Sequence, residues 1–216
     1  MLGELFDPNS ELTVSEEVRP HWSHPGVIVF VTFRTYDSIP REVLDRWERE
    51  KHDWMARRGY PVDQHWSAVL QNIDEREQVA FHQQFNRCRE DYLDNGRGRC
   101  LLRRPELARI VADALLHFDR SQYEMGDFVI MPNHVHLLAA FADADAMRKQ
   151  FTSWLRFSAA KINKRIGERG HFWQREPFDH LVRNPDQYDY LKTYIAENPI
   201  NAQLRKGEYL YRPYAD

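Results

Sequence analysis

The chain has few of the features that mark secreted, membrane-spanning or disulfide-rich proteins. It contains only two cysteines in 216 residues, Cys88 and Cys100, which form neither a CxxC motif nor a disulfide framework. Its apolar runs fall far short of the roughly 20 residues that cross a bilayer, so we expect no membrane partner. Residues 1–20 are acidic and polar, which predicts a flexible N-terminal arm and not a signal peptide. These absences together predict a cytoplasmic protein.

An overall basic charge is also missing, because the formal net charge is −3. This excludes histone-like binding of nucleic acid, so any anionic partner must meet a local basic patch. The charge is segregated along the chain: residues 146–216 hold 13 Lys and Arg against 8 Asp and Glu, whereas the remainder holds 17 against 25. The hydrophobic content of 42% is enough for one domain to bury a core.

Apolar spacing predicts a mixture of strands and amphipathic helices. The expected strands cover residues 26–34, 123–131, 134–141 and 178–183, and the expected helices cover 40–58, 74–93, 105–118, 147–166 and 185–197. Pro132 and Asn133 separate the second and third of these segments, which are either two adjacent strands joined tightly or one strand with a kink or bulge. The last helix should stop near Glu197, because Pro199 disfavours helical geometry at Asn198.

The stretch "VIMPNHVHLL" places His134 and His136 two residues apart in an expected strand. Residues i and i+2 of a strand point to the same face, so both imidazoles can reach one ion. Neutral imidazoles are common ligands of divalent metals. The chain has ten histidines, however, and a chance pair with a purely structural role fits this spacing equally well. Two ligands also do not complete a metal site.

The C-terminal third supplies further candidates. The expected helix from Met147 has an apolar stripe and, on its opposite side, Lys149, Arg156 and Lys164. This side is either an ordinary solvated face or a surface for a nucleic-acid backbone. On the last helix Tyr190, Tyr194 and Asn198 follow one another at four-residue intervals, so a phenol and an amide oxygen can face one site. Each tyrosine also fits a partly buried core position.

Four blocks, in this order, carry a resemblance to a known family: "YEMGDFVIMPNHVHLL", "WLRFSAAKINKRIG", "FWQREPFDHLVRN" and "YIAENPINAQL". They resemble the single-tyrosine HUH transposases, and in particular the branch of REP-associated tyrosine transposases. HUH denotes His, a bulky hydrophobic residue and His, matched here by His134, Val135 and His136. The resemblance covers about residues 20–204 and is weakest between 60 and 90.

The resemblance implies a fold and a set of site residues. It implies an α+β domain over residues 21–216, with an antiparallel sheet of the ferredoxin-like or RRM-like kind (the HUH endonuclease fold), helices on one face, and an added helical segment at about 56–104. Tyr194 falls at the position of the nucleophile, and His134, His136 and Asn198 fall at the positions of the metal ligands. Tyr190 is the alternate nucleophile, and His180 is the alternate ligand or a phosphate contact. Arg175 and Arg183 match family positions and, with the helix cations, can meet DNA phosphates.

The activity that follows is cleavage and rejoining of single-stranded, hairpin-forming DNA through a 5′-phosphotyrosine, with Mg²⁺ or Mn²⁺ as the metal. A monomer and a homodimer are both compatible with the sequence, and the expected location is the cytoplasm, at the nucleoid. Two other functions stay open. One is a domesticated nucleic-acid-binding protein that does not cleave. The other is a metal-dependent phosphodiester hydrolase in which the histidines activate water.

Overall fold

The structure is a computed structural model that describes residues 2–5, 13–16, 20–23, 26–175 and 177–214. It divides into two compact units, one made of Met1–Tyr36 with Arg99–Asp216, and the other made of Asp37–Gly98. The first unit is a layered α/β structure, and the second is helical. The helical unit, Asp37–Gly98, overlaps the added helical segment expected at about 56–104.

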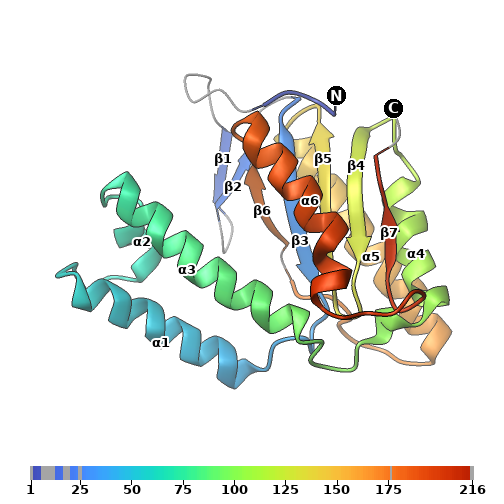
Figure 1. Cartoon of the computed structure of the whole chain (residues 1–216), viewed down its shortest axis with the longest axis horizontal. Helices are drawn as coiled ribbons and strands as arrows, with labels where there is room; N and C mark the ends of the chain where they lie inside the picture. The colour runs from blue at the N-terminus through green and yellow to red at the C-terminus, as the bar shows by residue number, and fades with distance from the viewer. Residues whose placement is uncertain (1, 6–12, 17–19, 24–25, 176, 215–216) are drawn as a thin grey trace. The chain divides into compact units, whose positions relative to one another are not determined.

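A five-stranded sheet forms the centre of the first unit (Figure 1). Its strands are β3 (Ile28–Arg34), β4 (Tyr123–Ile130), β5 (His134–Phe141), β6 (Phe178–Leu181) and β7 (Leu210–Arg212). They lie in the order β6-β3-β5-β4-β7, and every neighbouring pair is antiparallel. β6 lies at one edge of this sheet and β7 at the other.

The connections confirm the predicted fold class. Helix α4 (Pro105–Leu116) precedes β4 and helix α5 (Ala144–Ile166) follows β5. The path β3-α4-β4-β5-α5-β6 with sheet order β6-β3-β5-β4 is the split βαβ arrangement of ferredoxin-like folds, in which each helix-linked strand pair encloses a third strand. β7 is an addition at the β4 edge.

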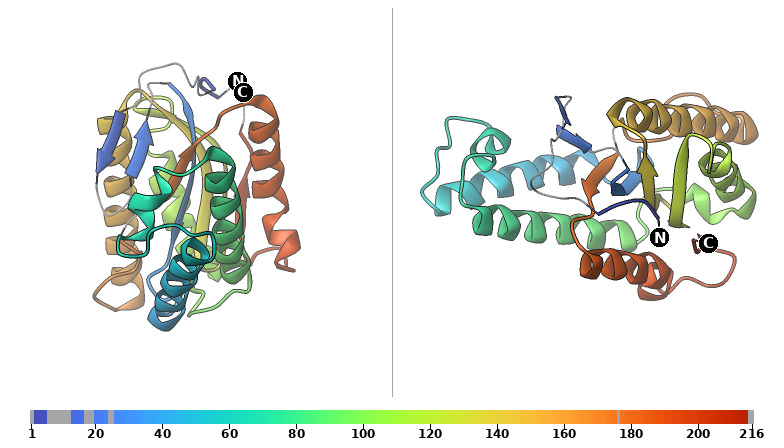
Figure 2. Two further views of the ribbon diagram at one scale, coloured as in Figure 1. Left: turned by 90° about the vertical axis from the view of Figure 1, so that its left-hand side faces the viewer. Right: turned by 90° about the horizontal axis from the view of Figure 1, so that it is seen from above.

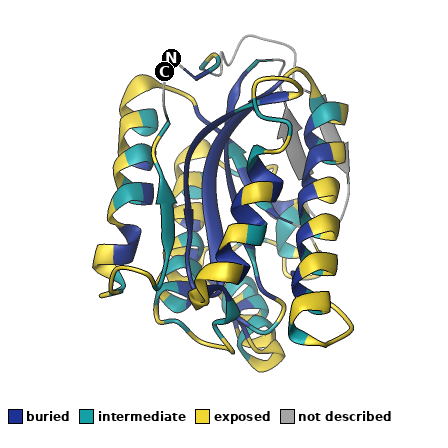
Figure 3. Cartoon of the chain, turned by 90° about the vertical axis from the view of Figure 1, so that its right-hand side faces the viewer, coloured by how far each residue is buried: buried dark blue, intermediate teal, exposed yellow. Residues whose placement is uncertain are grey.

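Helices cover both faces of the sheet, and the expectation of helices on one face was wrong. α4 and α5 pack on the face that carries Val29, Val31 and Phe33 of β3. Helix α6 (Pro185–Asn201) packs on the other face, against Ile28 and Phe30. Figure 2 (right) and Figure 3 show the sheet between α6 on one side and α5 on the other. The reason lies in β3, whose consecutive residues are apolar and therefore bury both faces.

Helix α6 runs four residues past its predicted end, because Pro199 is accommodated inside it. Proline has no backbone N–H to donate to the preceding turn, but its carbonyl oxygen still accepts a hydrogen bond. Ala202 N donates to Asn198 O at 3.0 Å and Leu204 N donates to Pro199 O at 2.9 Å, so the last turn is closed by hydrogen bonds beyond the proline. Asn198 consequently lies within the helix, one turn after Tyr194.

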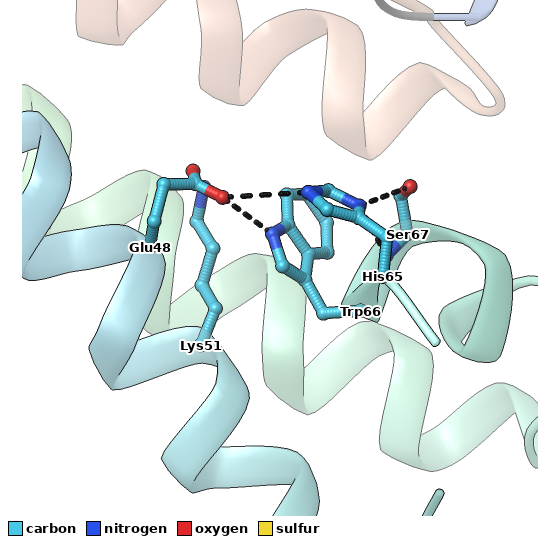
Figure 4. Close-up of polar contacts among 5 residues, drawn as sticks. All are labelled: Glu48, Lys51, His65, Trp66 and Ser67. Atoms are coloured by element: carbon cyan, nitrogen blue, oxygen red, sulfur yellow. Dashed lines mark hydrogen bonds and ion pairs between the residues drawn. The ribbon is translucent and has the colours of Figure 1, made fainter. Parts of the chain in front are cut away.

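The helical unit contains α1 (Arg41–Arg57), α2 (Trp66–Leu70) and α3 (Glu75–Asp94). Its core is largely aromatic, with Trp54, Phe81 and Phe85 buried together. Glu48 of α1 accepts a hydrogen bond from Trp66 Nε1 of α2 at 2.6 Å, which ties α1 to α2 (Figure 4). It accepts a second from Lys51 Nζ, three residues on in α1, at 2.8 Å.

Strands β1 (Thr13–Glu16) and β2 (Pro20–Ser23) form a separate antiparallel pair. Parts of the expected N-terminal arm, residues 6–12 and 17–19, lie outside the described residues. Leu2 is fully buried against the α6 face of the sheet, and Glu4 pairs with Val27. Within the described ranges, no helix is both long and apolar enough to cross a membrane.

Candidate active site

β5 carries His134 and His136 on the face of the sheet that α6 covers. Both side chains are fully buried, their ring centroids are 4.6 Å apart, and a nitrogen of one ring lies within 4.8 Å of a nitrogen of the other. This separation lets both imidazoles bind one ion. The arrangement follows from strand geometry, because only alternate side chains share a face.

Two hydrogen bonds orient these rings. His134 Nδ1 lies 2.7 Å from Oδ1 of Asn133, and His136 Nδ1 lies 2.8 Å from Oγ1 of Thr32. Thr32 is directly opposite His136 in the pairing of β3 with β5. Both contacts use Nδ1, so both rings present Nε2 away from their hydrogen-bonding partner.

Tyr194 reaches this pair from α6. Its Oη lies 3.3 Å from Nε2 of His136, and the two rings meet edge to face with centroids 5.2 Å apart. Tyr194 is half-buried as a residue, whereas both histidines are fully buried. A nucleophile in this place can meet a substrate that enters from outside.

Asn198, one turn after Tyr194 on α6, is a further polar residue on the side of the helix that faces the sheet. Helix α6 runs in the direction opposite to β5 (Figure 1), so the step from Tyr194 to Asn198 leads toward the end of β5 where His134 lies. The side chain is 1% exposed, and neither Oδ1 nor Nδ2 has a hydrogen-bond partner among the described residues. A buried amide left without partners costs about 1–3 kcal/mol, so a water molecule or a bound ion that contacts these atoms would stabilise the chain.

Phe30 packs against three of the rings that the sequence singled out. Its centroid lies 5.5 Å from that of His136, 6.1 Å from that of Tyr194 and 5.2 Å from that of His180. His180 of β6 is opposite Phe30, on the far side of β3 from β5. The structure thus places His180 on the same face as the histidine pair, with Phe30 between them.

Tyr190 lies one turn before Tyr194 and stacks on it, with centroids 6.3 Å apart. Its side chain is 66% exposed, which makes it one of the most exposed large side chains in the described part of the chain. The alternate nucleophile therefore lies on the outer side of Tyr194, while Tyr194 itself contacts His136.

Tyr211 of β7 is another phenol of the cluster on the α6 face. Burial raises its pKa, and the neighbouring carboxylate of Asp127, 3.2 Å from its hydroxyl, raises the pKa further, to about 12. This phenol stays protonated at neutral pH and acts as a hydrogen-bond donor to Asp127.

The predicted DNA-binding cations of α5 lie across the sheet from Tyr194. Lys149, Arg156 and Lys164 are exposed on α5, whose buried side packs on the opposite face of the sheet. Arg175 is exposed in the segment before β6, and Arg183 is exposed between β6 and α6. The α5 cations and Tyr194 therefore project from helices on opposite faces of the sheet.

Three residues of the site were not identified from the sequence: Thr32, Asn133 and Phe30. Asn133 precedes His134 directly, so its position beside the histidine pair was a readable signal. Thr32 and Phe30 are about a hundred residues away from the histidines and become visible only once β3 pairs with β5.

The donor set suits a divalent metal ion. Imidazole nitrogens are ligands of intermediate softness, and the amide oxygen of Asn198 is a hard ligand. Among the described residues, no donor makes a hydrogen bond to this oxygen. His134, His136 and Asn198 could therefore hold the ion, and Mn²⁺ suits a site of mixed nitrogen and oxygen ligands.

Comparison with known proteins adds one finding. No family model matches the chain, and no curated protein matches it. Among solved structures, the chain is similar to one described as a REP-associated tyrosine transposase bound to a REP hairpin, at 14% identity and a TM-score of 0.45 over 89% of this chain and 77% of that one. This is the family that the sequence motifs resemble.

Proposed function

We propose that the chain cleaves and rejoins single-stranded DNA with Tyr194 as the nucleophile. The observation that carries the proposal is the 3.3 Å contact between Tyr194 Oη and Nε2 of His136. It brings a phenol from the C-terminal helix to a buried histidine pair fit for a metal. A phenol next to a site for a cation and a phosphate is the arrangement that covalent phosphoryl transfer needs.

In the cleavage step, the Tyr194 oxygen forms a bond to phosphorus, and the bond from phosphorus to the 3′-oxygen breaks. The phenolic proton is lost to solvent and the departing 3′-oxygen takes one up, which leaves a free 3′-OH and a 5′-phosphate esterified to Tyr194. Attack by a 3′-OH on this ester reverses the step and rejoins a strand. The phosphotyrosine conserves the energy of the broken bond, so rejoining needs no nucleotide cofactor.

His134, His136 and Asn198 are proposed to hold a divalent metal ion, with Mn²⁺ or Mg²⁺ as candidates. When bound, the ion polarises the scissile phosphate and stabilises the charge that develops on it. The chain's own contribution is to keep these donors buried and oriented, through Thr32, Asn133 and Phe30, and to hold the Tyr194 hydroxyl beside them.

The proposed substrate is single-stranded, hairpin-forming DNA, as the sequence resemblance implies. Tyr190 supports a strand with unpaired bases near the site, because an exposed ring already stacked on Tyr194 offers a surface for base stacking. The α5 cations would meet more distant phosphates of the same molecule.

The test uses labelled single-stranded hairpin DNA and Mn²⁺ with the parent chain, Tyr194→Phe and Tyr190→Phe. A covalent protein–DNA adduct on a denaturing gel is expected for the parent and for Tyr190→Phe, and no adduct is expected for Tyr194→Phe. Cleavage without an adduct that survives in Tyr194→Phe would instead identify a hydrolase. Binding without cleavage by the parent would identify a nucleic-acid-binding protein that does not cleave.

A further inference from the structure

We infer that Asn133 and Thr32 are positioning residues that fix the tautomers of His134 and His136, so that Nε2 of each ring carries the lone pair offered to the metal. The inference deepens the proposed function, and it rests on that function for the identity of the ligand. The tautomers themselves are properties of the metal-free chain and can be measured separately.

For His134, the argument rests on the chemistry of an amide oxygen. Oδ1 of Asn133 can only accept hydrogen bonds, and it lies 2.7 Å from His134 Nδ1. His134 Nδ1 must therefore carry a hydrogen. In a neutral imidazole only one nitrogen is protonated, so Nε2 is the nitrogen that carries the lone pair.

For His136, the partner comes from another strand. Thr32 Oγ1 lies 2.8 Å from His136 Nδ1, and both side chains are buried. A threonine hydroxyl can accept a hydrogen bond from His136 Nδ1. In that case the lone pair on Nε2 points toward Tyr194 Oη, which lies 3.3 Å away and can donate to it. The chain Tyr194–His136–Thr32 then has a donor and an acceptor matched at each contact.

Strand β3 links the two contacts. Thr32 of β3 bonds to His136 directly, and just beyond the strand Thr35 N donates to the carbonyl of Asn133 at 2.8 Å. Met131 N also donates to the carbonyl of His134 at 2.8 Å, which closes the turn that carries Asn133. Both positioning residues are thus held by backbone pairing, and neither depends on a mobile loop.

The physical role is to prevent the wrong nitrogen from carrying the hydrogen. A ring with its hydrogen on Nε2 would direct an N–H group at the ion and could not bind it there. Outer partners of metal-binding histidines typically account for about 10–100-fold in metal affinity. We expect that range for loss of the Thr32 hydroxyl.

The first experiment is nitrogen NMR of the metal-free chain with ¹⁵N-labelled histidine. Both His134 and His136 are expected to be protonated on Nδ1, with assignments from His134→Gln and His136→Gln. Thr32→Val is expected to convert His136 to a mixture of tautomers while His134 is unchanged. A Nε2-protonated ring at either position in the parent would overturn the inference.

The second experiment measures Mn²⁺ affinity by calorimetry. Thr32→Val should weaken binding about 10–100-fold, whereas Thr32→Ser, which keeps the hydroxyl, should stay within about threefold of the parent. Thr35→Val is the matched control, because Thr35 is also buried. It lies three residues after Thr32, so in an extended chain its side chain points to the opposite face of the sheet. Thermal unfolding of each variant reports whether the fold is kept.

Asn133 is tested with Asn133→Asp and Asn133→Leu. The carboxylate still accepts from His134 Nδ1 and should keep the affinity, whereas leucine should lose it. Equal Mn²⁺ affinity for the parent, Thr32→Val and Asn133→Leu, each folded, would overturn the inference. If the parent itself binds no Mn²⁺, the proposed function fails, and the tautomers of the metal-free chain still decide the role of Asn133 and Thr32.

Discussion

Tyr194 Oη and His136 Nε2 are 3.3 Å apart, and this nitrogen is the one assigned to the metal. A nitrogen lone pair can accept a hydrogen bond from the phenol or bind an ion, but it cannot do both. In the metal-free chain the phenol therefore occupies the lone pair, and metal binding requires that Tyr194 give up this contact. The proposed nucleophile and the proposed metal site are therefore coupled through one atom.

Tyr194→Phe should consequently tighten Mn²⁺ binding while it abolishes the covalent adduct. Removing a competing hydrogen bond worth about 0.5–1.5 kcal/mol corresponds to roughly a 2–10-fold gain in affinity. Calorimetry of the two chains measures this, and Tyr190→Phe, on the exposed side of the same helix, should bind like the parent. Weaker binding by Tyr194→Phe would show instead that the phenol is itself a ligand.

Phe30 should matter for stability as well as for the site, because its buried ring contacts His136, His180 and Tyr194. Phe30→Ala is expected to lower the free energy of unfolding by about 3–5 kcal/mol, the usual cost of a large cavity. Phe157→Ala, at an exposed position on α5, is the matched control and should change it by less than about 1 kcal/mol. Denaturant unfolding measures the free energy of unfolding of both variants. An equal loss in the two would contradict the central position of Phe30.

The sequence predicted the local elements of the sheet unit well, for a physical reason. Helical periodicity and strand alternation depend on nearby residues, and the shared face of His134 and His136 follows from a spacing of two. The run of consecutive apolar residues in β3 was also a readable sign that both faces of the sheet are buried. It was used only to predict a strand over residues 26–34, and the expectation of helices on one face came from the family resemblance.

What could not be predicted depends on contacts between distant segments. The partner of His136 is Thr32, 104 residues away, and only the register of β3 against β5 reveals it. The same holds for the basic helix: its charges were visible in the sequence, but which face of the sheet it covers was not. The predicted end of α6 near Glu197 was wrong for a different reason. Hydrogen bonds from Ala202 N and Leu204 N continue the helix beyond Pro199.

Glu48 gives the helical unit a pH-dependent component of stability. Burial raises its pKa, but hydrogen bonds from Lys51 and Trp66 lower it more, so the net pKa lies below the ordinary value of 4.5. A lowered pKa means that the contribution is present above the unfolded-state value and is lost as the pH falls through the folded-state value. Glu48→Gln should therefore be less stable than the parent at pH 7, and the difference should shrink in acid.

Because Glu48 is partly solvent-exposed, this difference should be small and should decrease with salt. Denaturant unfolding at pH 7 and near pH 3, followed by tryptophan fluorescence, measures it. Glu50→Gln is the matched control, since Glu50 forms an exposed pair with Arg46 at 3.6 Å. A gap between Glu48→Gln and the parent that widens toward pH 3 would contradict the sign of the shift.

The α5 cations should separate DNA binding from DNA cleavage. Arg156 and Lys164 lie on the helix that covers the face opposite Tyr194 (Figure 3), so they can hold distant phosphates but cannot reach the scissile one. In Arg156→Ala/Lys164→Ala the affinity for single-stranded DNA should fall, and the slope of log affinity against log salt should drop by about 1.4, at about 0.7 per phosphate contact. The cleavage rate at saturating DNA should stay that of the parent.

The matched control for this double variant is Arg41→Ala/Arg46→Ala, which removes the same charge from exposed positions of α1. If net charge alone governed binding, both double variants would lose affinity equally, and the assignment of α5 would fail. If the rate at saturating DNA fell with the affinity, the α5 cations would act at the scissile phosphate. That result would contradict their position across the sheet, because charges separated by a buried sheet cannot contact the same phosphate oxygens.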